Sequence, residues 1–290
     1  MSAQPIKRQQ RICVAIPASV VSDVPHLREK THKVGLIGRA LAVFRIDEVI
    51  IYSDILNVDQ SRELRFISTI LSYMETPQYL RKSFFGMMPE LRYAGILPPL
   101  RTPHHPTRSR KKDLKAGEFR EGVVVSGCKR GVFVDVGVEQ PILIPDVSLR
   151  PGTRVTVKII SDGDNPKAIL INSSEIPIYW GYKVAISSFP LGRMIKERAF
   201  DMVIATSRLG EPLMKVKDKL LERWWGSKQI LIAFGSPTQG LHEIVRQEGF
   251  NLNELADFIV NTIPRQATET VRTEEALYAT LAILNFLTED

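Results

Sequence analysis

The sequence has few of the residues and segments on which several large classes of protein depend. Its 290 residues include two cysteines, Cys13 and Cys128, both in apolar, strand-like surroundings. This excludes a disulfide framework and a cysteine-rich zinc site. No apolar run approaches the ~18 residues of a membrane span, and the run from 12 to 17 behind the basic start is too short for a signal peptide. We therefore expect a protein of a reducing compartment, located in the cytoplasm.

A glycine loop in the C-terminal part lacks the residues that bind a triphosphate. Gly235 and Gly240 have the spacing of a phosphate-binding P-loop, but Leu241 and His242 stand where that motif has lysine and then serine or threonine. The dinucleotide motif G-x-G-x-x-G is also excluded, because Pro237 stands where its second glycine would be. The remaining glycines let the backbone approach a ligand closely. The loop therefore favours a weakly charged, nucleoside-like cofactor.

Positive charge is concentrated in the N-terminal third. The formal net charge is +7, and residues 1–116 hold 19 Lys and Arg against 10 Asp and Glu. The rest of the chain has a slight negative excess. A basic excess can simply aid solubility, but its clustering favours binding of a polyanion. We expect RNA to bind the N-terminal third, and the compact basic run 108–112 suits phosphate contacts or a solvated hinge.

The order of apolar runs predicts an α/β protein with a small β-domain inserted into it. Short buried runs alternate with helical patterns at both ends of the chain, which is typical of a parallel sheet. Between them, about five short alternating strands separated by glycine and proline predict a small closed barrel, most commonly an OB-fold. Its only aromatics are Phe119 and Phe133 and its charge is slightly negative, so we expect it to orient RNA, or to contact protein, rather than supply affinity. The predicted segments are 1–114, 115–175 and 176–290.

Two helices are expected to border the functional region. The first begins at a cap formed by Ser22 or Asp23 and reaches about Arg45. A basic stripe with a glycine gap runs along it opposite the core stripe, and it is either a solvated face or a binding surface. The last helix, 274–287, is capped by Thr273 and apolar nearly all round, so it is buried in the core or in a subunit interface. The basic stripe consists of Arg28, His32, Gly35 and Arg39.

A pair of adjacent histidines, His104 and His105, raises the possibility of a metal site. No cysteine, aspartate or glutamate lies at ligand spacing nearby. Metal ligands usually form a set of three or four such side chains. The sequence therefore favours a structural role for the two histidines.

Several motifs together resemble those of a known family. They are F-G-S-P-T-Q-G-L at 234–241, N-T-I-P at 261–264 and V-R-T-E-E-A at 271–276. They resemble the last two cofactor motifs of the SPOUT superfamily of RNA methyltransferases, and A-T-S-R-L-G at 205–210 resembles its first cofactor loop. T-P-Q-Y-L-R-K at 76–82 and L-R-Y-A-G-I-L-P-P-L at 91–100 are similar to the branch with an inserted OB domain. The resemblance implies a SPOUT methyltransferase domain with a C-terminal trefoil knot.

The resemblance also implies roles for individual residues. S-adenosylmethionine would be bound in a bent shape where three polar loops, near 206, 235 and 262, converge on one uncharged crevice. Arg28, Arg39 and Arg272 would be the catalytic residues that hold the target nucleotide, and helix 274–287 would form a homodimer. No metal is expected. The cofactor-binding residues would be Thr206, Ser207, Phe234, Gly235, Ser236, Gly240, Asn261, Thr262, Ile263, Pro264, Thr268 and Thr270.

The third loop departs from the family pattern at two positions. Relatives have glycine where this chain has Ala267, and a basic residue where it has Glu269, the nearest carboxylate to the loops by sequence. Two other functions remain possible from the sequence. One is a non-catalytic RNA-binding or ribosome-assembly protein on the same fold. The other is a nucleotide hydrolase, which the missing lysine after Gly240 disfavours.

Overall fold

The structure is a computed structural model that describes residues 5–163 and 165–289. The chain forms two compact units. The larger unit comprises Arg8–Met74, Glu90–Pro99 and Tyr182–Asp290, and the smaller unit comprises Met1–Lys7, Glu75–Pro89 and Leu100–Gly181. The first four residues of the predicted basic segment 1–116 lie outside the described residues.

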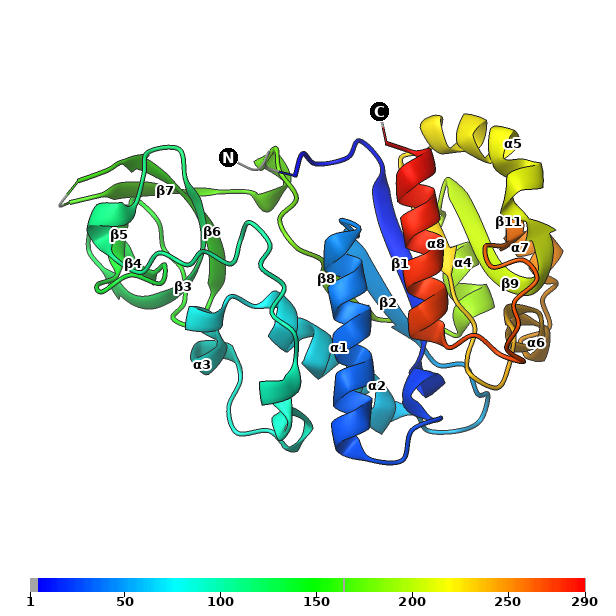
Figure 1. Cartoon of the computed structure of the whole chain (residues 1–290). Coiled ribbons are helices and arrows are strands. Elements are labelled where there is room, and N and C mark those ends of the chain that lie inside the picture. Colours follow the sequence, from blue (N-terminus) through cyan, green and yellow to red (C-terminus); the bar gives the residue numbers. More distant parts are fainter. Residues whose placement is uncertain (1–4, 164, 290) are drawn as a thin grey trace. The chain divides into compact units, whose positions relative to one another are not determined.

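The larger unit is built on a six-stranded parallel sheet, as the sequence predicts (Figure 1). The strand order is β11-β9-β10-β1-β2-β8, so β1 lies at the centre with β10 on one side and β2 on the other. Every residue of β2, and all but the first of β1, is buried, as expected for a sheet covered on both faces. The strands are β1 Arg11–Pro17, β2 Glu48–Tyr52, β8 Lys183–Ile186, β9 Met202–Pro212, β10 Gln229–Ala233 and β11 Phe258–Asn261.

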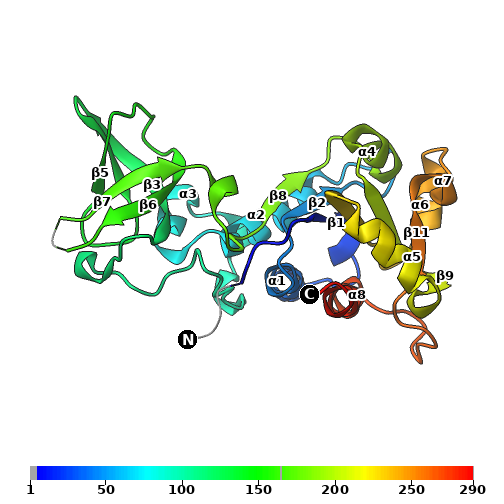
Figure 2. The same cartoon turned by 90° about the horizontal axis from the view of Figure 1, so that it is seen from above.

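Helices cover both faces of this sheet (Figure 2). Helices α4, α6 and α7 pack on the face that presents Cys13, Ala15 and Tyr52, whereas α1 and α8 lie side by side on the other face. Within the described part of the chain, no helix has the length and apolar character needed to cross a membrane. The helices are α1 Leu27–Val43, α2 Ser61–Glu75, α4 Leu191–Arg198, α5 Leu213–Trp225, α6 Leu241–Gln247, α7 Leu252–Leu255 and α8 Thr273–Leu287, with short 3-10 turns at Ala18–Val21, Pro89–Leu91 and Ala94–Ile96.

The smaller unit contains a five-stranded antiparallel sheet of order β5-β4-β3-β6-β7. Its apolar residues form a core of their own, which includes Val124, Val134 and Val157. The unit begins before the predicted boundary at 115, because segments 75–89 and 100–114 belong to it. Its elements are β3 Phe119–Cys128, β4 Gly131–Asp135, β5 Ile142–Pro145, β6 Arg154–Ser161, β7 Lys167–Ile171, α3 Arg81–Phe84 and 3-10 turns Gln78–Leu80, Lys111–Asp113 and Ser173–Glu175.

A buried polar network in the smaller unit contains the two adjacent histidines. His104 and His105 both place Nε2 within 2.8 Å of the Glu75 carbonyl oxygen, and Arg154 donates two hydrogen bonds to the Glu75 carboxylate. Burial alone would raise the pKa of Glu75, but the hydrogen bond from His104 and the charge of Arg154 outweigh it and lower the pKa to about 2. Among the described residues no group of three or more His, Cys, Asp or Glu side chains that could hold a metal ion occurs. The two histidines instead hydrogen-bond to the backbone at Glu75 within this network.

The first helix begins later than the sequence predicts. Helix α1 starts at Leu27, and its N-cap residue His26 makes no side-chain cap. The capping role proposed for Ser22 or Asp23 is therefore wrong. The carboxylate of Asp23 instead accepts hydrogen bonds of 2.6 and 2.7 Å from the buried ammonium of Lys33, because a buried charge must be paired.

The basic stripe on α1 is not a continuous exposed face. Gly35 is buried, and a Cβ there would lie 3.0 Å from Leu97 and 3.1 Å from Pro98. Arg39 is half-buried and donates a hydrogen bond of 2.9 Å to the carbonyl of Pro99. Segment 94–99 therefore covers the glycine gap, while Arg28 at the start of the helix stays exposed.

Candidate functional site

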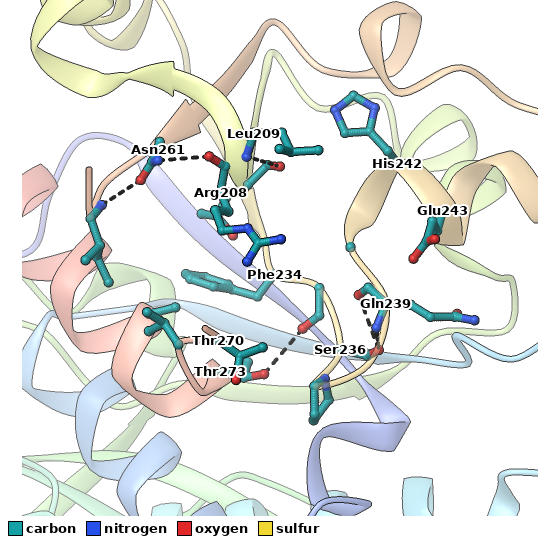
Figure 3. A pocket seen from close by; sticks show the side chains of 18 of the residues that line it. Arg208, Leu209, Phe234, Ser236, Gln239, His242, Glu243, Asn261, Thr270 and Thr273 are labelled. Atoms are coloured by element: carbon teal, nitrogen blue, oxygen red, sulfur yellow. Dashed lines mark hydrogen bonds between the residues drawn. The ribbon is translucent and has the colours of Figure 1, made fainter. Parts of the chain in front are cut away.

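A cavity of about 570 Å³ lies where three neighbouring strands of the parallel sheet end (Figure 3). Its walls come from the residues that follow Ala205 in β9, from the loop after β10, and from the segment that follows β11. Ligand sites in open α/β sheets lie at the carboxyl ends of the strands, and volumes of 300–1,000 Å³ are typical for small-molecule sites. All three predicted loops therefore line one cavity.

The first wall is a bulge in β9. This strand pairs with β11 at Ala205 and resumes pairing only at Glu211, so residues 206–210 leave the ladder with β11. Residues 206–209 of this bulge border the cavity. A Cβ on Gly210 would lie 2.8 Å from the backbone of β11, which is why the bulge closes at a residue without a side chain. Thr206 is fixed by a 2.9 Å hydrogen bond from its hydroxyl to the Ala233 carbonyl of β10.

The second wall is the glycine loop after β10. The buried hydroxyl of Tyr52 donates a 2.7 Å hydrogen bond to the carbonyl of Phe234, which anchors the start of the loop. A Cβ on Gly235 would lie 3.0 Å from the Gln239 carbonyl oxygen, so the loop folds back too tightly for most side chains. Ser236 holds that fold, because its hydroxyl accepts a 2.9 Å hydrogen bond from the backbone N–H of Gln239.

The third wall follows β11 and leads into α8. The side chain of Asn261 donates to the carbonyl of Arg208 and accepts from the N–H of Ile263, both at 2.9 Å. It thereby ties the third loop to the bulge in β9 (Figure 3). Thr273 is the first residue of α8 rather than its N-cap, which is Arg272. Its hydroxyl donates instead to the Gly235 carbonyl at 3.3 Å, so the predicted cap is wrong and the residue links two walls.

The cavity is not the uncharged crevice that the sequence predicts. Two arginines and two glutamates line it, namely Arg208, Arg246, Glu243 and Glu269, and no lysine occurs among the described lining residues. The guanidinium of Arg208 donates a 2.7 Å hydrogen bond to the carbonyl of Glu269. Equal numbers of opposite charges give the walls no formal net charge. This distribution does not suit a triphosphate, which needs concentrated positive charge.

Comparison with known sequences identifies the family. Residues 11–284 match the profile of a protein family described as "Putative RNA methyltransferase". The chain belongs to this family. It is therefore an RNA methyltransferase, a transferase enzyme.

Individual relatives agree with the family profile. The chain is 33% identical to the human 28S rRNA (uridine-N(3))-methyltransferase over 96% of this chain and 78% of the human protein. The mouse enzyme of the same name is 32% identical over 96% of this chain and 76% of its own length. An uncharacterized protein of Haloarcula marismortui is 34% identical over 95% of this chain and 99% of that protein.

The methyltransferase cavity contains most of the residues predicted to bind a cofactor, but not all. Pro264 and Thr268 do not line it, although they belong to the third loop. The three predicted catalytic arginines, Arg28, Arg39 and Arg272, also lie outside its lining. The predicted residues that line the cavity are Thr206, Ser207, Phe234, Gly235, Ser236, Gly240, Asn261, Thr262, Ile263 and Thr270.

Sequence reasoning missed the charged part of the lining. It selected short polar side chains and glycines in the loops, and it left out Arg208 in the first loop and Glu243 and Arg246 in the helix after the second. These charged residues could have been found from their position within or beside the motifs. Arg208 stands within A-T-S-R-L-G, and Glu243 follows the second glycine by three residues, so both had to lie near the strand ends.

Proposed function

We propose that this methyltransferase transfers a methyl group from S-adenosylmethionine to N3 of a uridine in large-subunit ribosomal RNA. The names of the mouse and human relatives supply the acceptor atom and the RNA. The observation that carries the proposal is that three polar loops, at the ends of β9, β10 and β11, surround one cavity. Methyl transfer from a sulfonium is an in-line displacement, so the protein must bring donor and acceptor to near contact, ~3 to 3.5 Å.

The cavity has the groups that a nucleoside donor would need. Among the described residues, the backbone N–H groups of Gly235 and Thr262 have no hydrogen-bond partner, and both residues line the cavity. They are available for the ring nitrogens or ribose oxygens of the donor. The hydroxyls of Thr206 and Thr273 already donate hydrogen bonds to backbone carbonyls. We therefore propose that they hold the loops in place rather than bind the donor.

The path of the chain supports a SPOUT fold with a C-terminal trefoil knot. β11 lies at the edge of the sheet beside β9, whereas α8 returns to pack against α1 (Figure 1). The third loop, which joins β11 to α8, is tied both to the bulge in β9 and to the glycine loop. A crystal structure with the donor bound tests this assignment, and an unthreaded third loop would refute the knot.

The strand order of the smaller unit supports the proposed OB-fold. Its first strand, β3, pairs with β4 and β6, and the edge strands β5 and β7 lie close together, as in a partly open five-stranded Greek-key barrel. We propose that this barrel orients RNA. We also propose that the basic segment 1–116 binds it, with Arg28, Arg39 and Arg272 holding the target region. The cytoplasm remains the location we expect.

Calorimetry with S-adenosylmethionine tests the donor site. Asn261→Ala removes one hydrogen bond to the bulge in β9 and one within the third loop. At about 1 kcal/mol each, we expect binding to weaken by roughly 10- to 30-fold. Gly235→Val places side-chain atoms against the Gln239 carbonyl, so binding should be lost. The matched controls are Asn253→Ala on the surface and Gly95→Val, where a Cβ would meet nothing within 4 Å.

The calorimetric result distinguishes the enzyme from the rival hypothesis, which is a non-catalytic RNA-binding protein on the same fold. Donor binding that is absent in the wild type, or unchanged in Asn261→Ala and Gly235→Val, would support the rival. Mass spectrometry of nucleosides from ribosomal RNA incubated with the protein and the donor then identifies the product. A methylated nucleoside other than N3-methyluridine would refute the assigned acceptor atom and leave the donor site intact.

A further inference from the structure

The cavity contains a pair of opposite charges on facing walls. Arg208 extends from the bulge in β9, and Glu243 extends from the first turn of α6. Figure 3 shows the guanidinium of Arg208 and the carboxylate of Glu243 directed into the cavity from opposite sides. The loops that we assign to the donor have backbone amides and hydroxyls for its nucleoside part. This pair therefore has a role still to be explained.

Arg208 is held in place from both its backbone and its side chain. Its carbonyl accepts the hydrogen bond from Asn261, and its Nη1 donates to the carbonyl of Glu269. A guanidinium has five N–H groups, so one bond leaves donors in the same plane for a ligand. Because arginine keeps its proton throughout the working pH range, Arg208 supplies a fixed positive charge and hydrogen-bond donors at one wall.

Glu243 is mounted on a rigid element and has an available carboxylate. The neighbouring residues Leu241, Ile244 and Val245 are buried in the core, which fixes α6. Its backbone N–H donates to the carbonyl of Gly240. Within the described part of the chain, its carboxylate takes part in no hydrogen bond or ion pair, and the residue is exposed to the cavity. A general base needs this combination of a fixed position and a free lone pair.

We propose that the acceptor uracil binds between these two side chains, with Glu243 as the general base for N3 and Arg208 as the donor to a flanking carbonyl oxygen. This assignment rests on the proposed function. Uracil N3 carries a proton between two carbonyl groups, and removal of that proton leaves negative charge on N3, O2 and O4. A guanidinium beside O2 or O4 stabilises this charge as it develops.

The steps balance without a metal or a redox partner. The Glu243 carboxylate takes the N3 proton first, because the proton and the incoming methyl group occupy the same in-plane position on N3. The electron pair left on N3 then forms the bond to the methyl carbon. The bond between that carbon and sulfur breaks with its electrons going to sulfur, which converts the sulfonium to a neutral thioether. Glu243 later releases its proton to solvent.

Glu269 is the other carboxylate in the described lining, and it is less suited to this role. It belongs to an irregular loop, and its carbonyl is already bound by Arg208. The two carboxylates can be compared directly, because both line the cavity. Glu254, an exposed glutamate on α7 that does not line it, is the matched control.

The test measures donor affinity by calorimetry and single-turnover methyl transfer to a ribosomal RNA transcript from pH 6 to 9. We expect Glu243→Gln to slow transfer by about 100-fold or more, the usual contribution of a general base, with donor affinity unchanged within twofold. Its rate should rise about tenfold per pH unit as hydroxide replaces the base, while the wild-type rate levels off. Arg208→Gln should lose about 100-fold, and Arg208→Lys less.

Three results would overturn the assignment. Loss of donor affinity in Glu243→Gln equal to its loss of rate would show that the charged pair binds the amino-acid part of the donor. A large loss of transfer rate in Glu269→Gln, with a near-normal rate in Glu243→Gln, would show that the general base is Glu269 in the third loop. A pH profile of Glu243→Gln parallel to the wild type would exclude proton transfer. A wild type that binds the donor but leaves uridine N3 unmodified refutes the proposed function itself.

Discussion

Individual buried side chains set the response of this methyltransferase to acid. Burial, with the neighbouring His104 as the next contribution, lowers the pKa of His105 from 6.5 to about 4. His105 is therefore neutral in the folded protein where an unfolded histidine would be protonated. Glu75 behaves in the opposite sense, because its partners keep it ionised down to a pKa of about 2. Both groups belong to the smaller unit, so we expect acid to destabilise that unit.

The first prediction follows from the sign of these shifts. As pH falls from 6.5 to 4 the unfolded state gains a proton at His105 that the folded state does not, so the free energy of unfolding falls by at most about 1.4 kcal/mol per pH unit. The stabilising contribution of Glu75 is present above pH 4.5 and is lost from 4.5 to 2. Urea denaturation at a series of pH values measures the free energy of unfolding across both pH ranges.

His105→Gln isolates the contribution of His105 to stability between pH 6.5 and 4. Glutamine retains an N–H donor for the Glu75 carbonyl but does not titrate. The decline in stability between pH 6.5 and 4 should therefore be smaller in this variant than in the wild type, and the decline below 4.5 should remain. His26→Gln is the control because the side chain of His26 is exposed. If stability declined between pH 6.5 and 4 as much in His105→Gln as in the wild type, the lowered pKa of His105 would be contradicted.

At the residue scale, sequence reasoning located the loops but not their internal bonds. It named Asn261 as a cofactor-binding residue, and this residue lines the cavity, but it assigned Thr273 only to a helix cap. The structure uses its hydroxyl to join α8 to Gly235. Such long-range hydrogen bonds depend on which loops meet, and the local pattern of a helix start has no information about that.

At the scale of single elements, α8 has two different faces. Leu277, Leu281 and Leu284 are buried against the rest of the larger unit. The outer face carries a stripe of apolar residues at helical spacing, formed by Ala279, Ala282, Ile283 and Phe286, and Phe286 is 78% exposed. An exposed apolar stripe of this kind usually marks an interface. The sequence left core and dimer open for this helix. The structure shows that one face is buried in the core, and the dimer through the exposed stripe stays a prediction.

The second prediction concerns this stripe. We expect the wild type to sediment at twice the mass of a single chain, and Phe286→Asp to shift it to the monomer, because a carboxylate in a desolvated apolar contact is unfavourable. Met214→Asp on α5 is the control, since Met214 is also large, apolar and exposed. Circular dichroism should show an unchanged fold in both variants. A wild type that sediments as a monomer would refute the dimer.

Several elements could be predicted because their apolar runs are long and bounded by turn signals. The apolar runs predict strands at 11–17, 49–52, 184–187 and 229–234. The observed β1 has the predicted bounds, and β2, β8 and β10 agree with theirs within one residue at each end. Strand β11 was missed, because it is a four-residue edge strand and only Val260 is fully buried. The extension of β9 beyond Ala205 was missed as well, since pairing resumes only after a polar bulge. Short or interrupted ladders leave little signal in the sequence.

At the scale of the whole molecule, the uneven charge predicts how RNA binding depends on salt. Neutralising phosphates releases counterions, so the logarithm of the binding constant should fall linearly with the logarithm of the salt concentration. Arg110 and Lys112 are exposed members of the basic run in the N-terminal third. Replacing both by alanine should weaken binding to any RNA and reduce the slope by about 0.7 to 0.9 for each phosphate that is no longer neutralised.

Filter binding or fluorescence anisotropy at several salt concentrations measures this slope. Lys217→Ala with Lys219→Ala on α5 is the matched control, because it removes the same charge from the part of the chain without a basic excess. We expect the control to leave the slope near that of the wild type. Equal slopes for the wild type and the Arg110 and Lys112 variant would mean that this run does not bind phosphates.

The five-stranded antiparallel sheet could be predicted, because a change from helix-and-strand to short-strand texture is visible in the sequence at Gly117 and all five strands follow it. The other segments of the smaller unit could not be predicted. Segments 75–89 and 100–114 have helical or extended patterns like those of the larger unit, and they join the smaller unit through long-range bonds such as Arg154 to Glu75. The three-segment division of the sequence remains a prediction about domains rather than a description of these compact units.

The central place of β1 in the sheet has a consequence for synthesis of the protein. Cys13 of β1 pairs with Leu231 of β10 on one side and with Glu48 of β2 on the other. A nascent chain therefore completes all of the five-stranded sheet before the second neighbour of β1 leaves the ribosome. Until then the β10 side of β1 has unpaired backbone groups, so we expect the partly synthesised chain to be prone to aggregation at this edge.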